Sequence, residues 1–402
     1  MKAEGPWSAG NIFNGYVRPY LPFVAATTGC VFVSCLYIFH IVALCYGKFR
    51  LYRKVTFSNK KHGVSIIKPL VGVDDNLESN LISFFTLHYY KYELLFCVHD
   101  DEDEALELIR GLMKRYPDVD ATVFIGGENV GLNPKINNMM PAYRASKYPL
   151  ILISDSGIKM REDTLMDMVN SMEDDVAIVT QTPYCEDRPG LASALEQIYF
   201  GTSHGRIYLA GNAMRFVCST GMSSLLRKTA LEECGGIAAF GGYLAEDFFF
   251  GLACHKRGWR AVISSYPALQ NTANLTVSKF NARICRWMKL RIAMLPHIVL
   301  VEPFQDCFAS GIIMSFSLKY LLGVNPLIYF PLHCLTWFSC DYSLIHILQN
   351  SPLTFSFWTF LKLWIIREAV GPLIFLKALC QPDIEWRSGR FRLQWGGRIK
   401  KL

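Results

Sequence analysis

The chain has 402 residues, 51% of them hydrophobic and 19% charged, and its formal net charge is +7. Its length suits one large domain or two ordinary ones, and its composition is typical of a soluble part joined to a membrane part. The modest positive charge favours basic residues beside a membrane over a nucleic-acid-binding surface, so we expect no nucleic-acid partner. The 13 cysteines form no Cys-x-x-Cys pair and no zinc-type spacing, which favours reduced thiols.

The first predicted element is a membrane helix at residues 21–46, a run without Asp, Glu, Lys or Arg. The run exceeds the roughly 20 residues that a helix needs to cross a bilayer, and it exceeds the core of a signal peptide. Basic residues without any acid among them follow the run, at Lys48, Arg50, Arg53, Lys54, Lys60 and Lys61. The positive-inside rule therefore predicts residues 1–20 in the lumen and the chain from residue 47 in the cytosol.

The next part of the chain, up to about residue 265, alternates short apolar runs with amphipathic stretches. The apolar runs predict strands at 64–68, 93–98, 121–125, 150–154 and 176–180. The amphipathic stretches predict helices at 104–115, 135–145, 164–172 and 192–201. This alternation predicts an α/β, Rossmann-like domain over residues 47–277, with a doubly wound and mostly parallel sheet.

Acidic residues follow two of these predicted strands. Asp100 comes just after the strand at 93–98, and Asp155 directly follows the strand at 150–154. Each alone is more often a turn or a helix cap. Ligands of such sheets, however, bind outside the carboxyl ends of the strands. Two such ends in one sheet, with Glu246 and Asp247 further along, favour a binding site.

Cationic residues that suit a phosphorylated ligand occur at two places. Lys135 opens a predicted helix, where its charge and the helix N-terminus suit a diphosphate, with an ordinary surface lysine as the alternative. Arg283 and Arg286 are three residues apart, share a helical face and precede Trp287. We expect the two arginines to clamp a diphosphate, with lipid headgroup binding as the alternative.

The last part of the chain is expected to associate with the membrane. Residues 278–306 begin with a basic amphipathic helix typical of a membrane interface. Residues 307–322 and 326–347 predict the two spans of a membrane hairpin. Residues 355–380 predict a broken or interfacial helix, because charged residues and a Gly-Pro pair interrupt this apolar segment. The basic tail, 381–402, favours the cytosol, whereas four simple spans would place it in the lumen.

The order and spacing of Glu246-Asp247 and Arg283-x-x-Arg286-Trp287 resemble two signatures of membrane glycosyltransferases with the GT-A fold. In that resemblance Asp247 is the general base that activates an acceptor hydroxyl for inversion. Glu246 orients the helix or the acceptor, and the reverse assignment stays open. Asp155 stands where such enzymes carry Asp-x-Asp, the metal motif, although Gly157 occupies its third position. One carboxylate still suits Mg²⁺ or Mn²⁺ when phosphate and water oxygens share the ion.

Further segments resemble ceramide glucosyltransferases, from the first membrane run to the tail. They are Lys68-Pro-Leu-Val-Gly-Val-Asp74, Phe124-Ile-Gly-Gly, Asn133-Pro-Lys-Ile-Asn-Asn, Asp155-Ser-Gly, Gln197-Ile-Tyr-Phe-Gly-Thr-Ser-His204, Ala245-Glu-Asp, Arg283-x-x-Arg286-Trp287 and Trp386-Arg-Ser-Gly-Arg-Phe-Arg.

The resemblance implies transfer of glucose from UDP-glucose to the primary hydroxyl of ceramide, on the cytosolic face of the Golgi membrane. It carries over Asp100, Asp155 and Asp247 with the two arginines and Trp287 as the functional set. It also places His204 near the nucleotide or the acceptor; from its chemistry alone His204 is more often structural.

Two other readings remain open from the sequence. A polyprenyl-phosphate sugar transferase or a processive polysaccharide synthase would use the same donor chemistry, although a synthase would need more membrane spans. A non-catalytic membrane scaffold could keep a nucleotide-sugar fold, but the presence of all three acidic positions and both arginines favours an enzyme.

Overall fold

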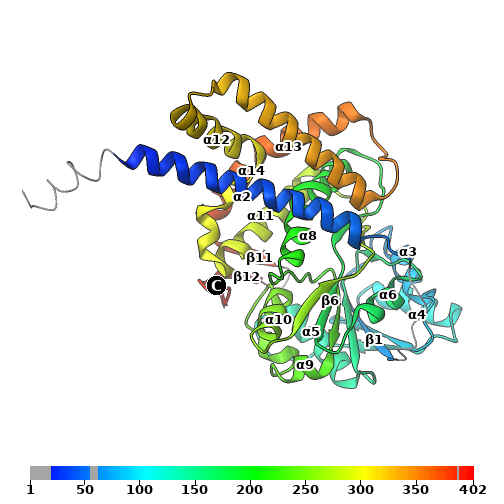
Figure 1. The fold of residues 1–402 in the computed structure, drawn as a ribbon. Coiled ribbons are helices and arrows are strands. Elements are labelled where there is room, and N and C mark those ends of the chain that lie inside the picture. The colour runs from blue at the N-terminus through cyan, green and yellow to red at the C-terminus, as the bar shows by residue number, and fades with distance from the viewer. Residues whose placement is uncertain (1–19, 55–61, 387–388) are drawn as a thin grey trace, which may run out of the picture.

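The computed structural model describes residues 20–54, 62–386 and 389–402. Residues 1–19 of the expected lumenal segment, and the basic residues Lys60 and Lys61, lie outside the described residues. The described chain forms an α/β domain, a group of long apolar helices beside it and a small C-terminal sheet (Figure 1).

A seven-stranded sheet of order β3-β2-β1-β4-β8-β6-β9 forms the centre of the α/β domain. Its strands are β1 Val64–Leu70, β2 Tyr92–Val98, β3 Ala121–Ile125, β4 Leu150–Ser154, β6 Val176–Thr180, β8 Ser223–Arg227 and β9 Arg260–Ile263. Neighbouring strands pair in parallel except at β8, which is antiparallel to β4 and β6. The predicted doubly wound, mostly parallel sheet is confirmed, and its five predicted strands differ from the observed ones by two residues at most.

Helices cover both faces of the sheet (Figure 1). They include α3 Leu77–Phe85, α4 Ala105–Arg115, α5 Pro134–Ala145, α6 Thr164–Ser171, α9 Lys228–Glu232 and α10 Glu246–His255. Consecutive residues of a strand point to opposite faces, so Ile66 and Ile67 of β1 enter two different hydrophobic cores. Both faces are buried, which explains why the parallel strands read as continuous apolar runs.

The helix expected at residues 192–201 is shorter than predicted. Helix α7 spans Leu191–Tyr199, continues as a π-helical turn at Phe200–His204, and becomes α8 at Gly205–Ala213. Two glycines let this segment approach helix α13, Pro326–Gln349: a Cβ on Gly201 would lie 2.4 Å from Ile345 Cγ1, and one on Gly205 2.4 Å from Leu348 Cδ1. The sequence pattern did not predict this π-helical turn or its close packing against α13.

The apolar helices α2 Leu21–Arg50, α12 Cys307–Leu322 and α13 lie beside one another on one side of the α/β domain (Figure 1). Among the described residues, α2 is the helix long and apolar enough to cross a membrane by itself. Residues 296–304 and α12 would make a second candidate only as one span bent by 78°. The two C-terminal spans expected at 307–322 and 326–347 are therefore helical as predicted but not confirmed as spans.

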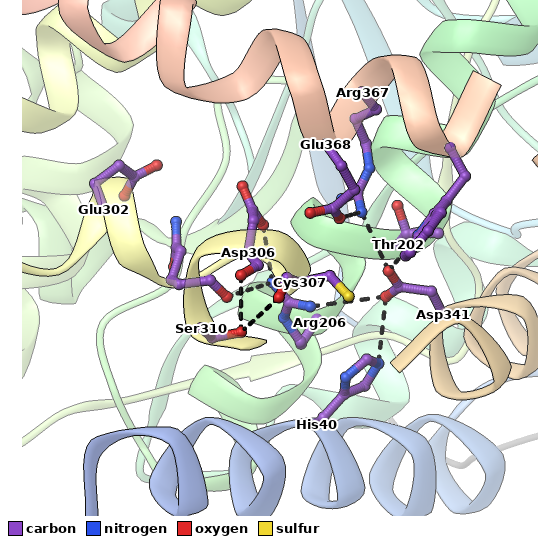
Figure 2. A network of polar contacts seen from close by, with 12 residues as sticks. His40, Thr202, Arg206, Glu302, Asp306, Cys307, Ser310, Asp341, Arg367 and Glu368 are labelled. Atoms are coloured by element: carbon purple, nitrogen blue, oxygen red, sulfur yellow. Dashed lines mark hydrogen bonds and ion pairs between the residues drawn. The ribbon is translucent and has the colours of Figure 1, made fainter. Parts of the chain in front are cut away.

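A buried polar network fastens these helices to α8 and to α14, Phe357–Cys380 (Figure 2). Asp341 of α13 lies 3.3 Å from His40 Nε2 of α2 and 3.2 Å from Arg367 Nη2 of α14. Arg206 of α8 lies 3.7 Å from Asp341 and 3.2 Å from Asp306, which precedes α12. Asp341 thus joins side chains of α2, α8 and α14 where solvent is excluded, and Arg206 extends the network to Asp306, whose side chain is 26% exposed.

Two small sheets complete the fold. The sheet of β5 Ile158–Lys159, β7 Pro183–Cys185 and β10 Ala268–Gln270 lies beside the main sheet. The tail forms the antiparallel sheet of β11 Asp383–Trp386, β12 Gly389–Leu393 and β13 Ile399–Lys401. It packs against helix α11, Val277–Met294, which carries the two arginines of the predicted site. Placement of α11 at a bilayer interface stays a prediction.

Candidate active site

Lys135 is the central cation of the candidate site. The Asn133 side chain caps helix α5 by accepting hydrogen bonds from the Lys135 and Ile136 backbone N–H groups, and Pro134 opens the first turn. Lys135 Nζ lies 2.8 Å from Asp155 Oδ1, at the end of β4, and 3.1 Å from Glu246 Oε1. Burial lowers the pKa of Lys135, but Asp155 and Glu246 outweigh it and raise the pKa above the usual lysine value.

The loop before Glu246 is held against the same turn. The Asn133 backbone N–H donates to Gly241 O at 2.8 Å, and Asn133 Nδ2 donates to Tyr243 O at 2.7 Å. A Cβ on Gly131 would lie 2.6 Å from the Gly241 backbone, so the two loop backbones are in direct contact. The Gly131–Lys135 turn and the start of α10 therefore form one structural unit, although they belong to two separate motifs in the sequence.

The contacts of the two carboxylates differ in a way that separates their roles. Glu246 is buried and uses Oε1 for Lys135 and Oε2 for Asn133 Nδ2, at 3.0 Å. Asp247 is half-buried and accepts a short hydrogen bond from the Gly221 backbone N–H on Oδ2. Burial and the neighbouring Glu246 raise the pKa of Asp247 to about 7, against the opposing effect of Lys135. Asp247 thus combines access with a basicity that suits proton transfer near neutral pH.

The two arginines of α11 are not equivalent. Arg283 is paired with the fully buried Glu196 of α7, and its guanidinium lies over the Trp287 ring at 5.2 Å. Glu196 also pairs with Arg188, so one buried carboxylate holds both guanidiniums, and Arg283 is engaged inside the protein. Burial and the neighbouring Arg283 lower the pKa of Arg286, and Asp155 opposes that shift. Arg286 is thus the arginine whose charge acts on the Asp155 side of the site.

His204 lies in an aromatic cluster at the π-turn. Its ring stacks on Trp287 and on Tyr199, with centroid distances of 5.8 and 5.5 Å, and lies 4.9 Å from the Tyr208 ring. Burial, Arg291 and Arg283 lower the pKa of His204 to about 3, so its imidazole is neutral at cellular pH. Its Nδ1 is buried without a hydrogen-bond partner among the described residues.

Asp100 is not in contact with this cluster. It is exposed at the turn after β2, where its carboxylate accepts a hydrogen bond from the Glu102 backbone N–H at 3.1 Å. Strand β1 separates β2 from β4, so Asp100 and Asp155 follow strands that are not neighbours. The structure brings Lys135, Asp155 and Glu246 into contact, with Asp247 next to Glu246 and Arg286 close enough to interact with the Asp155 charge. Asp100 follows a strand two positions away in the same sheet.

Sequence reasoning did not predict roles for Lys68 and Glu196. Lys68 of β1 is fully buried, donates to the Asp155 backbone oxygen at 2.7 Å, and lies 3.8 Å from the centre of the Phe84 ring. Burial lowers the pKa of Lys68 to about 7. A lysine inside an otherwise apolar strand was the available signal for Lys68, since such a residue is rarely buried without a partner. Glu196 pairs with Arg188, eight residues earlier, and with Arg283, which is distant along the chain, and the sequence pattern did not single out either pairing.

The residues around Asp155 fit a cation only in part. Within the described ranges, no group of three or more His, Cys, Asp or Glu side chains is arranged to hold a metal ion. The Asp155 side chain is 40% exposed, however, and a hard cation accepts one carboxylate when phosphate and water oxygens complete its shell. The site fits an ion that arrives with a diphosphate, and it does not form a complete protein cage.

Comparison with known proteins shows the family of this chain. Residues 35–399 match glycosyl transferase family 21. The chain belongs to glycosyl transferase family 21. It is 60% identical to ceramide glucosyltransferase 3 of Caenorhabditis elegans, covering 93% of this chain and 82% of the relative. It is 53% identical to ceramide glucosyltransferase 1 of the same organism, covering 93% and 81%.

Among solved structures, the mannosyltransferase PcManGT from Pyrobaculum calidifontis in complex with GDP-Man and Mn²⁺ has a TM-score of 0.49 and 16% identity, covering 87% of this chain and 99% of that chain. Membership of the glycosyl transferase family agrees with the GT-A fold class expected from the sequence. The expectation of an enzyme, rather than a scaffold, is confirmed as well.

Arg286→Lys tests whether Arg286 has the donor-side role that separates it from Arg283. The lysine keeps the charge but loses the planar two-pronged contact with a diphosphate. We expect turnover to fall more than about tenfold, or roughly 1.4 kcal/mol of barrier. Steady-state kinetics on membrane-bound protein measures the change, and the exposed Arg257→Lys serves as the matched control. Near-normal turnover in Arg286→Lys would reassign this residue to lipid contact.

Proposed function

We propose that this chain transfers glucose from UDP-glucose to the primary hydroxyl of ceramide, with inversion at the anomeric carbon. The products are β-glucosylceramide and UDP. The observation that carries the proposal is the joining of the Lys135–Asp155 pair to Glu246 and Asp247, which sets a cation for the donor beside a base for the acceptor. The two relatives that are more than half identical to this chain bear the name ceramide glucosyltransferase.

Asp247 acts on the acceptor. Its carboxylate accepts the proton of the ceramide primary hydroxyl while the hydroxyl oxygen forms a bond to the anomeric carbon and the bond from that carbon to UDP breaks. The Gly221 N–H on Oδ2 fixes the direction of the carboxylate, and Ser219 Oγ donates to the Asp247 backbone oxygen at 2.6 Å. Glu246 holds Lys135 and Asn133 and thereby sets the start of α10.

Lys135 and Arg286 act on the donor. The negative charge that develops on UDP as it leaves is balanced by cations already in place, which lowers the barrier without reorganisation. Asp100 binds the uridine and ribose side, and Trp287 with Arg283 closes the site beside His204. A Mg²⁺ or Mn²⁺ ion at Asp155 belongs to the proposal and would supply further positive charge to the diphosphate.

We also propose that the enzyme is a multi-pass Golgi membrane protein whose catalytic domain faces the cytosol. The basic residues after α2 support this orientation through the positive-inside rule. The acceptor is itself a membrane lipid, and the helices beside the α/β domain would bring the site to the bilayer (Figure 1).

Glycosylation of Asn274 tests that orientation. Asn274-Leu-Thr276 is a glycosylation sequon, and both Asn274 and Thr276 are exposed. A lumenal domain would expose this sequon to the glycosylation machinery, whereas a cytosolic one would not. We therefore expect no glycan. A mass shift that a glycosidase removes, and that Asn274→Gln abolishes, would reverse the orientation.

The function itself is tested by transfer from radiolabelled UDP-glucose to a panel of lipid acceptors. We expect labelled product with ceramide and none with polyprenyl phosphate, sterol or diacylglycerol. Parallel incubations with UDP-galactose and UDP-N-acetylglucosamine define the donor. Product with polyprenyl phosphate and none with ceramide would replace the proposed acceptor, and the absence of transfer to every acceptor would revive the scaffold reading.

A further inference from the structure

The inner face of the tail sheet fastens together two parts of the candidate site. Ile384, Phe391, Leu393 and Ile399 pack against Leu244, Leu290 and Ala293. The Ile399 N–H donates to Gly242 O at 3.1 Å, and the Gly396 N–H donates to Ala293 O at 2.9 Å. Leu244 is two residues before Glu246, and Ala293 is on the helix of Arg286, so the sheet bridges the base and the arginines.

The turn between β12 and β13 also contacts α10 directly. A Cβ on Gly397, which has φ +81°, would lie 2.6 Å from Phe249 Cζ. The Phe249 ring stacks on Tyr243 at 3.9 Å between centroids, and Tyr243 pairs with Arg398 as an isolated β-bridge. Phe249 is two residues after Asp247. A displacement of this turn would therefore be transmitted to the helix that carries the base.

The outer face of the same sheet is basic. The described residues of the whole sheet carry five cationic and two carboxylate side chains, a net charge of 5 − 2 = +3. Arg392 and Lys400 are paired on the outer face, whereas Lys401 lies opposite the inner Phe391 at the edge of the sheet. The exposed cations are Arg390, Arg392, Arg398, Lys400 and Lys401. Asp383 neutralises Arg392 through contacts of 2.8 and 3.1 Å, but Lys400 and Lys401 have no carboxylate partner in the described part of the chain. Trp395, at the β12–β13 turn, is 70% exposed.

The sheet follows a helix whose outer surface is apolar. Helix α14 ends at Cys380, and β11 begins three residues later at Asp383. One side of α14 exposes large apolar residues with helical spacing: Trp358, Ile365, Ile366, Leu373, Leu376 and Leu379. A mostly apolar exposed surface of this kind, which also carries Lys362 and Lys377, marks a surface that contacts a membrane or a partner. A basic surface with an exposed tryptophan directly beyond its end has the composition of a membrane–water interface.

We propose that the β11–β13 sheet binds an anionic lipid surface through its outer face. The occupant is a layer of negatively charged headgroups, which attracts cations within about a Debye length and admits the Trp395 ring at headgroup depth. The inner face then holds the loop before Glu246 in place against α11. This inference does not depend on which lipid is the acceptor.

Hydrogen–deuterium exchange of the full-length protein in nanodiscs tests the proposal. One preparation contains phosphatidylcholine alone, and the other also contains phosphatidylserine. We expect exchange of peptides covering 389–402 to slow at least about tenfold with phosphatidylserine, and high salt to reverse the effect. Peptides covering 241–249 should follow in the same direction, because they contact the inner face.

The variant Arg390→Gln/Lys400→Gln/Lys401→Gln removes exposed charge from the sheet and should lose most of this protection. Lys114→Gln/Lys256→Gln/Arg257→Gln removes the same charge from exposed positions at the ends of α4 and α10 and should keep it. Trp395→Ser should lose part of the protection from hydrogen exchange. Exchange of core peptides in phosphatidylcholine alone shows that each variant is folded.

Two results would overturn the proposal: equal exchange of 389–402 in both kinds of disc, or equal loss of protection in the two triple variants. Glucosyl transfer in phosphatidylcholine discs is recorded for every variant. That activity reports the proposed function separately, because it does not require the anionic lipid.

Discussion

Asp247→Asn is expected to reduce glucosyl transfer by at least about 100-fold, the lower end of what a general base contributes. Asparagine keeps the size of the side chain and its packing but cannot accept the acceptor proton. Binding of UDP-glucose should persist within a few-fold, because the proposed function assigns the donor to Lys135, Asp155 and Arg286. Turnover of labelled UDP-glucose and a direct binding measurement on the same preparation separate the two effects.

Asp155→Asn is the matched variant on the donor side. It removes one carboxylate, as Asp247→Asn does, and should weaken donor or metal binding first. The opposite pattern, with UDP-glucose binding lost in Asp247→Asn and kept in Asp155→Asn, would exchange the two roles. A third outcome, full activity in Asp247→Asn, would move the base to Glu246.

The pKa of Asp247 also predicts how the rate depends on pH. Burial and Glu246 raise this pKa to about 7, and the base acts only when it is deprotonated. Transfer should therefore be greatest above that pKa and fall as the pH decreases through it. His204 does not produce this limb, because burial lowers its pKa to about 3. Rates in Asp247→Asn should lack the dependence near neutral pH.

The sequence predicted the strands whose side chains are mostly apolar. Strand β8 was missed because two of its five residues, Ser223 and Ser224, are buried yet polar. Their hydroxyls bond to Gln181 Oε1 and Thr180 Oγ1, partners that exist only after β6 and β8 pair. A short strand whose buried polar side chains are hydrogen-bonded by neighbouring strands resembles a loop when strands are predicted from the periodicity of apolar residues.

The residues of the site were predictable one at a time, but their pairing was not. The motifs identified Lys135, Asp155 and Glu246, whereas the contact of one ammonium with both carboxylates depends on the close approach of Gly131 to Gly241. Similarly, the three-residue spacing of Arg283 and Arg286 indicated a shared face, but Arg283 pairs with Glu196, which also holds Arg188. Spacing along a helix fixes its own geometry and carries no information about the charge of an element packed against it.

Asp341→Ala is expected to destabilise the folded protein by about 3–5 kcal/mol, because it leaves buried cations without their counter-charge. Asp341 is fully buried, and its carboxylate accepts a hydrogen bond from Trp364 Nε1 at 2.8 Å besides contacting His40, Arg206 and Arg367 (Figure 2). Thermal unfolding in detergent, followed by loss of the monodisperse species, measures the effect. Ser343→Ala, at an exposed position on the same helix, should leave the transition unchanged.

A triple variant distinguishes an uncompensated charge from lost packing. Arg367 pairs with the buried Glu368 as well as with Asp341, so a compensated variant removes the arginine together with both carboxylates. If the cost arises from unbalanced charge, Asp341→Ala/Arg367→Met/Glu368→Gln should be more stable than Asp341→Ala alone, because buried partners replaced together are far less costly than a set broken on one side. Lost packing would instead make the triple variant less stable than Asp341→Ala. Arg206 would still hold Asp306 in both variants, so α8 and the aromatic cluster at His204 should keep their attachment to α12. An unfolding transition that is the same in wild type and Asp341→Ala would show that the network does not fasten these helices.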